Sequence, residues 1–167
     1  MRKIIVAGNW KMYKTPDEAI EFVENIQGVE AKEHVRVIVC APYLALPAMM
    51  EHVVKPLEIS AQNVHQAEEG AFTGEISANM LKGIGVGITL VGHSERRQYF
   101  AETDDIVSQK VSRALSEGLE VILCVGESLV SREEGKEKDV VSTQLYAALS
   151  GVSSEDMKQL IVAYEPV

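Results

Sequence analysis

The sequence is poor in cysteine, in aromatic residues and in long apolar runs. Of its 167 residues only two are cysteine, Cys40 and Cys124, and aromatic residues make up 5%. Two cysteines exclude a disulfide-rich scaffold, and because each ends an apolar run they predict two buried, reduced thiols. The apolar run Ile4–Gly8 is too short for the core of a signal peptide, and no later run approaches the length of a membrane span. These absences predict a cytoplasmic protein with no membrane partner.

The sequence also lacks any concentration of positive charge. Its 25 acidic and 16 basic residues give a net charge of −9, with Lys and Arg scattered among the acids. Such a balance argues against nucleic acid as a partner. An anionic small molecule could still bind through a local cation or through backbone N–H groups. With 46% apolar residues and no linker-like or low-complexity tract, residues 1–167 are predicted to form a single domain.

Short apolar, β-branched runs recur along the chain and predict strands. None of them alternates between apolar and polar residues, which is typical of strands buried on both faces of a parallel sheet. The six runs are Lys3–Gly8, Val35–Cys40, Leu57–Ala61, Val86–Gly92, Leu119–Val125 and Leu160–Tyr164.

Helical segments lie between these runs. Thr15-Pro16 predicts a helix start, with threonine as the N-cap and proline at the first helical position. Thr103 is predicted to cap a second helix that Gly118 ends. Residues 131–149, SREEGKEKDVVSTQLYAAL, are predicted to form one long helix with acids in its first turn.

Strands that alternate with helices about every thirty residues indicate parallel βαβ units. Two architectures fit this alternation, an open doubly wound sheet and part of an eight-stranded barrel. Periodicity alone does not choose between them. In both, the carboxyl ends of the strands gather the chemistry.

Ionisable residues follow several of the predicted strands. Asn9 and Lys11 come after the first strand, His93 after the fourth and Glu165 after the sixth. An amine, an imidazole and a carboxylate that converge at one edge form a usable set of acid and base groups. The sequence therefore predicts a site for proton transfer at this edge.

Four motifs resemble motifs of the triosephosphate isomerase family, and they follow one another in the same order and at the same spacing as in that family. They are AGNWKMYK, VGHSERR, CVGE and AYEPV, with APYLAL, SAQNVH and GAFTGEISANML in between. The resemblance implies an α/β fold of the (β/α)8 TIM barrel type. A barrel of this kind takes about 250 residues. The resemblance therefore implies an incomplete barrel here, with about six of eight βα units, that ends at the sixth strand.

The family resemblance also implies an activity and a role for each residue at the strand ends. It implies an isomerase of glycolysis and gluconeogenesis that interconverts dihydroxyacetone phosphate and glyceraldehyde 3-phosphate through an enediolate, without a cofactor. Glu165 would remove the proton next to the carbonyl, and His93 would polarise the carbonyl and move protons between the two oxygens. Lys11 would attract the anionic substrate and stabilise negative charge, and Asn9 would help to place the substrate.

Residues around His93 are consistent with this account. Ser94 can open a short helix, whose N-terminus disfavours a charged imidazolium. Glu95 is similar to an acid of the family that contacts the catalytic residues rather than the substrate, and we expect it near Lys11.

The resemblance further implies a homodimer. A loop bracketed by glycines, Gly70–Glu75, carries Phe72 and Thr73 and is similar to the loop with which the family reaches a neighbouring subunit. No metal site is expected, because His34, His52 and His65 share no ligand spacing.

Two other interpretations remain open. One is another enzyme on the same barrel, such as an aldolase or a sugar-phosphate epimerase, which would need a Schiff-base lysine or a metal set. The second is an inactive barrel fragment that acts as a binding or assembly piece and needs a complementary C-terminal segment, because open strand edges invite pairing.

Overall fold

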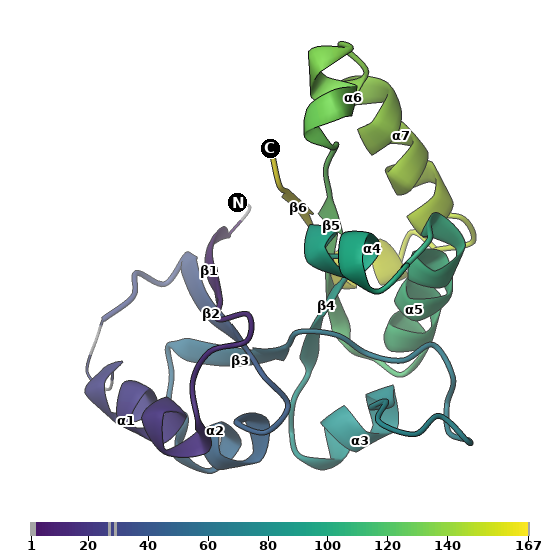
Figure 1. Cartoon of the computed structure of the whole chain (residues 1–167). Coiled ribbons are helices and arrows are strands. Elements are labelled where there is room, and N and C mark those ends of the chain that lie inside the picture. The colour runs from purple at the N-terminus through teal and green to yellow at the C-terminus, as the bar shows by residue number, and fades with distance from the viewer. Residues whose placement is uncertain (1–2, 27, 29, 167) are drawn as a thin grey trace. The chain divides into compact units, whose positions relative to one another are not determined.

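The computed structural model describes residues 3–26, 28 and 30–166. Figure 1 shows the course of the chain, which divides into two compact units. The N-terminal unit comprises Met1–Gln62 and Met80–Ile88, and the C-terminal unit comprises Asn63–Asn79 and Thr89–Val167. That residues 1–167 form a single domain therefore stays a prediction.

Three parallel strands form the sheet of the N-terminal unit. They are β1 (Ile4–Asn9), β2 (Val35–Ala41) and β3 (Leu57–Ala61). β1 pairs with β2 from Ile4 opposite Val35, and β2 pairs with β3 from Val37 opposite Leu57. All three predicted strands are confirmed to within one residue, because continuous β-branched runs are a strong local signal.

Two helices of this unit, α1 (Pro16–Ile26) and α2 (Leu46–His52), contact each other. α1 begins where the sequence predicts, since the Glu18 N–H donates to the Thr15 hydroxyl at 3.4 Å. The Glu18 carboxylate in turn accepts from the Thr15 N–H at 2.7 Å, which completes a capping box.

The C-terminal unit repeats the parallel arrangement with β4 (Ile88–Val91), β5 (Glu120–Val125) and β6 (Leu160–Tyr164). β5 and β6 are parallel, with Val121 opposite Leu160. The helical elements after β3 are, in chain order, α3 (Ala78–Gly83), α4 (Ser94–Tyr99), α5 (Asp104–Ser116), α6 (Leu129–Glu133), α7 (Glu137–Ala148) and the 3₁₀ turn η1 (Asp156–Gln159). α3 and β4 each cross the division between the two units.

α5 and α7 contact each other and both contact β5. The Thr103 hydroxyl accepts from the Ile106 N–H at 3.3 Å, so the predicted cap of α5 is confirmed. The buried side chains of α5 include Val107, Val111 and Ala114, which pack as one face of the helix.

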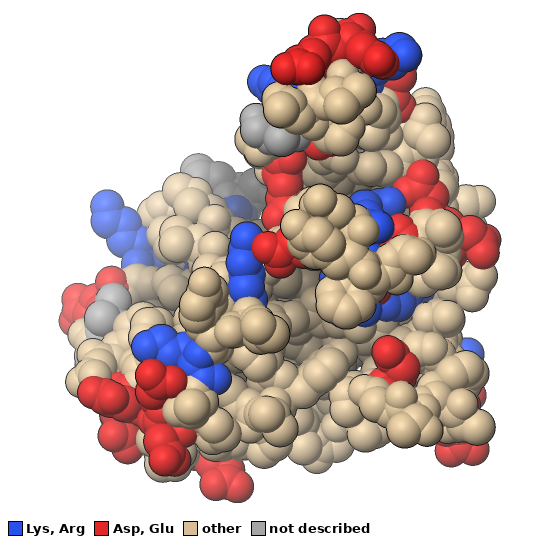
Figure 2. Space-filling model, in the orientation of Figure 1, with Lys and Arg blue, Asp and Glu red and all other residues tan. Residues whose placement is uncertain are grey.

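The prediction of one long helix over residues 131–149 is wrong. α6 ends at Glu133 and α7 begins at Glu137, with Gly135 at a φ of +70° between them. The Gly135 N–H donates to Arg132 O at 3.0 Å, and the Lys136 N–H donates to Ser131 O at 2.8 Å. These bonds close a glycine-ended helix stop, which outweighs the helix-forming residues on either side. Figure 2 shows acidic side chains gathered over this turn, where Glu133 and Glu134 are exposed.

The expectation that all six strands are buried on both faces is also wrong for two of them. Ile4 and Val6 of β1 are 55% and 56% exposed, and Val162 and Tyr164 of β6 are 47% and 49% exposed. β1 and β6 stand at the two ends of the strand order. A strand with a hydrogen-bonded neighbour on one side only leaves more of its side-chain surface uncovered.

A network of charged side chains is buried in the C-terminal unit. The Lys110 ammonium donates to the carboxylate of Glu102 and to the side-chain oxygen of Asn63, and the Arg96 guanidinium donates to the same Glu102 oxygen. The side chains of Lys110 and Glu102 are only 4% and 3% exposed. Burial alone would raise the pKa of Glu102, but the bonds from Lys110 and Arg96 outweigh it and lower that pKa. The Lys110 ammonium and the Glu102 carboxylate thus offset the cost of each other's burial.

None of the helices in the described residues has the length and apolar character needed to cross a membrane.

Candidate active site

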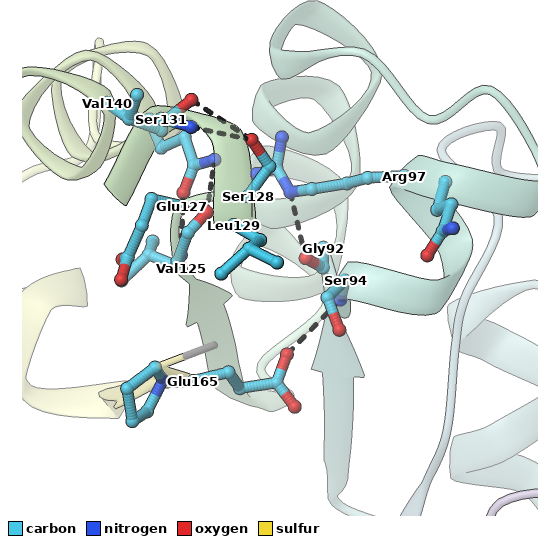
Figure 3. A pocket seen from close by; sticks show the side chains of 14 residues that line it. Gly92, Ser94, Arg97, Val125, Glu127, Ser128, Leu129, Ser131, Val140 and Glu165 are labelled. Carbon is cyan, nitrogen blue, oxygen red and sulfur yellow. Dashed lines mark hydrogen bonds between the residues drawn. The ribbon is translucent and has the colours of Figure 1, made fainter. Parts of the chain in front are cut away.

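Two of the predicted residues meet in the C-terminal unit. His93 directly precedes α4, and Glu165 follows β6. The His93 Nε2 lies 2.9 Å from Glu165 Oε1, and the Ser94 backbone N–H donates to Glu165 Oε2 at 3.2 Å. Figure 3 shows the Glu165 carboxylate turned toward Ser94. Residues 72 positions apart in sequence thus share one hydrogen-bonded cluster at the strand ends.

The position of His93 determines which ring nitrogen carries the proton. His93 is the N-cap of α4, and its Nδ1 accepts from the Glu95 backbone N–H at 3.2 Å. A nitrogen that accepts cannot also carry a hydrogen, so the proton of the neutral ring is on Nε2. Nε2 therefore donates to Glu165. The Glu95 carboxylate lies 3.6 Å from Nδ1, which is too far for a hydrogen bond.

Glu165 is an ionised carboxylate in this arrangement. The hydrogen bond from His93 lowers the pKa of Glu165, partial burial opposes this, and the bond from the Ser94 N–H lowers it further. The Glu165 side chain is 33% exposed, whereas the His93 side chain is 8% exposed. A buried donor and a more accessible acceptor leave the carboxylate reachable by a small molecule.

Glu165 also borders an open pocket of about 870 Å³ within the C-terminal unit (Figure 3). Its wall includes Ser94 and Arg97 from α4, and Glu127 and Ser128 from the segment after β5. The Arg97 guanidinium is held in place by Gly92 O at 2.9 Å and by Asp104 at 2.5 Å. The volume is in the range of small-molecule sites.

Asn9 and Lys11 form a second cluster at the end of β1, in the N-terminal unit. The Asn9 side-chain oxygen accepts from the Lys11 backbone N–H at 2.9 Å, which holds Lys11 at a φ of +53°. Gln62, at the end of β3, donates to Asn9 Oδ1 at 3.1 Å and to Lys11 O at 2.8 Å. The meeting of Lys11 with His93, with Glu95 and with Glu165 would join two units, so it stays a prediction.

Sequence reasoning missed Gln62 as a member of this cluster. It lies in the SAQNVH motif and directly follows β3. That position at a strand end was the available signal.

A third cluster, also missed as part of the site, surrounds Glu127 after β5. Tyr164 O–H lies 3.0 Å and 3.1 Å from the two carboxylate oxygens of Glu127, and Arg132 Nη1 donates to Oε1 at 2.6 Å. The Glu127 carboxylate is buried, and its own backbone N–H, then Arg132 and Tyr164, lower its pKa against the effect of burial. This cluster links Glu127, which precedes α6, and Arg132 in the last turn of α6 to Tyr164 at the end of β6, next to Glu165 in sequence.

The loop predicted to reach a neighbouring subunit is exposed. Phe72 is 48% exposed and its ring lies 4.3 Å, centroid to centroid, from the ring of His65 in the same chain. Thr73 is exposed. Its use in a dimer stays a prediction.

Within the residues that the structure describes, no group of three or more His, Cys, Asp or Glu side chains is placed to hold a metal ion.

An imidazole and a carboxylate within hydrogen-bond reach of each other, at the carboxyl ends of parallel strands, have the chemistry that acid–base proton transfer requires. Residues 4–167 match the sequence model of the family "Triosephosphate isomerase". The chain belongs to the triosephosphate isomerase family. It is therefore an α/β protein with six parallel strands that form part of a TIM barrel, as the motifs predicted.

Relatives whose alignments cover nearly the whole chain are also named triosephosphate isomerase. The chain is 48% identical over 167 residues to the triosephosphate isomerase of Acetivibrio thermocellus, an alignment that covers 99% of the chain and 66% of the relative. It is 52% identical to that of Caldanaerobacter subterraneus subsp. tengcongensis, over 100% of the chain and 68% of the relative. The chain thus spans about two thirds of the length of these relatives.

Proposed function

We propose that this chain supplies the proton-transfer groups for the interconversion of dihydroxyacetone phosphate and glyceraldehyde 3-phosphate. The observation that carries the proposal is the bond of 2.9 Å between His93 Nε2 and Glu165 Oε1. Membership of the triosephosphate isomerase family supports the choice of substrate.

Glu165 acts as the base in this proposal. When substrate enters, the carboxylate exchanges its bonds to Ser94 and His93 for the C–H proton on the carbon next to the carbonyl. The electron pair of the broken C–H bond forms the C=C bond of the enediolate, and the carbonyl oxygen takes the negative charge. Glu165, now protonated, returns the proton to the neighbouring carbon, so the reaction is an isomerisation without net gain or loss of atoms.

His93 supplies the matching acid. Its Nε2–H, freed from Glu165, donates to the substrate oxygen on which charge develops. The bond from the Glu95 N–H to Nδ1 keeps the ring in the tautomer that this step needs. Because the ring starts neutral, it can give a proton to one oxygen and recover a proton from the other.

Lys11 and Asn9 are proposed to bind the anionic substrate. The side-chain oxygen of Asn9 fixes the turn that Lys11 occupies, and Gln62 braces both. A cation held on such a turn suits a phosphate ester, which the net charge of −9 would otherwise repel.

A coupled isomerase assay on chain of verified mass tests the proposal. The chain is assayed alone and as one polypeptide joined to the C-terminal third of the Acetivibrio thermocellus relative. We expect weak or no turnover by the chain alone and clear turnover by the fusion, with Glu165→Gln lowering it at least about 10²-fold. Glu51→Gln, an exposed acid on α2, is the matched control and should leave the rate unchanged. Absence of turnover from both folded proteins would contradict the proposal.

We also propose that the family's homodimer forms through the loop Gly70–Glu75. The compartment that we propose for the chain is the reducing cytoplasm. The exposure of Phe72 and Thr73 supports this use of the loop. Sedimentation of the fusion should show a dimer, and Thr73→Arg should shift it toward the monomer. A dimer that Thr73→Arg leaves intact would exclude this loop as the contact.

A further inference from the structure

Gln144 makes a paired contact with the residue that directly follows the end of β5. It lies on α7, is 8% exposed, and directs both polar atoms of its side chain at the backbone of Gly126. The Gly126 N–H donates to Gln144 Oε1 at 2.9 Å, and Gln144 Nε2 donates to Gly126 O at 3.0 Å. The amide therefore binds the donor and the acceptor of one residue, as a neighbouring strand would, where β5 has already ended at Val125.

Gly126 in turn lies against the backbone of Glu165. A Cβ atom built on Gly126 would stand 2.4 Å from the Glu165 carbonyl oxygen and 3.6 Å from the Glu165 Cβ. The Glu165 N–H donates to Val125 O at 2.9 Å. The carbonyl of Val125 belongs to the same peptide group as the Gly126 N–H that Gln144 binds. The backbone of Glu165 thus rests on residues 125 and 126, and no side chain fits between them.

We propose that Gln144 is a positioning residue for Glu165. It holds the Gly126 peptide in place, Gly126 supports the Glu165 backbone, and the carboxylate is thereby set at 2.9 Å from His93 Nε2. The inference rests on the proposed function for its catalytic meaning, because Gln144 touches no reacting atom. The effect of Gln144 on the contact between Glu165 and His93 does not depend on that function.

The chemistry of glutamine fits this task better than an apolar residue would. Both polar atoms of the amide are used, and both partners lie on one backbone residue. A side chain of the same length without the amide would fill the space but leave the Gly126 N–H and C=O unpaired beside Glu165. Small displacements of a catalytic group are costly, since about 1 Å can lower a rate about 10²-fold.

The test measures the contact between His93 and Glu165 directly, by NMR of chain with ¹⁵N-labelled histidine. In the parent we expect a His93 Nε2–H proton protected from exchange by its bond to Glu165. Gln144→Met should speed the exchange of that proton at least about tenfold. Gln144→Glu keeps the acceptor for the Gly126 N–H but turns an oxygen toward Gly126 O, so it should change the exchange rate in the same direction.

Two controls separate positioning from loss of stability. Ala148→Gly, at the buried end of the same helix, weakens α7 without touching Gly126 and should leave the His93 signal unchanged. Gln109→Met, the same change at an exposed site on α5, should also leave it unchanged. If Gln144→Met does not fold, Gln144→Glu decides the question.

In the fusion with the relative's C-terminal third, Gln144→Met should lower kcat about 10²-fold and change KM less than about threefold. A His93 signal that neither Gln144 variant alters would overturn the inference, whatever the activity. A signal that Gln144→Met alters, in a protein whose parent fusion is inactive, would uphold the positioning and contradict the proposed function. The two failures are thus distinguishable.

Discussion

Removing one charge from the buried network of Glu102 and Lys110 should destabilise the chain far more than removing a charge at its surface. Glu102→Gln keeps the shape of the side chain, so no cavity adds to the effect. It leaves the Lys110 ammonium, 4% exposed, with neutral acceptors, Asn63 Oδ1 and the new amide oxygen, in place of the carboxylate. Breaking a buried ion pair in this way costs about 3–5 kcal/mol of unfolding free energy.

The same substitution at Glu155 is the matched control. Glu155 pairs with Lys158 at 2.6 Å, but these side chains are 78% and 70% exposed. Water and salt screen such a pair, so Glu155→Gln should change the free energy of unfolding by less than about 1 kcal/mol. The two variants remove the same charge from the same chain and differ in burial.

Urea and thermal unfolding followed by circular dichroism measure both variants. For a chain of this length about 1 kcal/mol corresponds to about 2–4 °C in Tm, so Glu102→Gln should lower Tm by about 6–20 °C. Replacing both partners, as Glu102→Leu with Lys110→Met, should recover part of the loss because no unpaired charge remains. If Glu102→Gln lies within about 1 kcal/mol of Glu155→Gln, the reasoning from burial is refuted.

Two further predictions concern protonation. The pKa values of Glu102 and Glu165 are both lowered from 4.5 in the folded chain. The stability that these ionised carboxylates contribute is therefore fully present above pH 4.5, and it is lost as the pH falls through their folded-state pKa values. Urea midpoints between pH 7 and pH 3 should show this loss, and Glu102→Gln should reduce it; a midpoint equal at both ends would contradict the linkage. Burial raises the pKa of the Cys40 thiol to about 11. At pH 8 a thiol reagent should therefore label Cys40 slowly in the native chain and rapidly in urea, and equal rates would contradict its burial.

Local signals in the sequence determined most of the secondary structure. Thr15-Pro16 and Thr103 begin helices because a hydroxyl that caps a helix acts on residues two or three positions away. The strands follow runs of β-branched residues for the same reason, since neighbours along the chain decide the local backbone preference. Where the local preferences conflicted, as at Gly135 among helix formers, the sequence alone predicted the wrong outcome.

The sequence also pointed to the residues with chemistry at the strand ends. Parallel strands place their carboxyl ends together, so Asn9, Lys11, His93 and Glu165 could be chosen by position and residue type. The tertiary structure alone decided that His93 donates to Glu165 through Nε2, because the backbone N–H of Glu95 occupies Nδ1.

Gln144 shows what the sequence could not reveal. It lies in the middle of a helix, its partner Gly126 is 18 residues away, and Gly126 in turn contacts Glu165, 39 residues further on. No local pattern marks such a chain of contacts, because it exists only after the helix and the strands have packed. The sequence by itself determined the elements and the chemically able residues, whereas packing decided which backbone holds the carboxylate and at what distance from the imidazole.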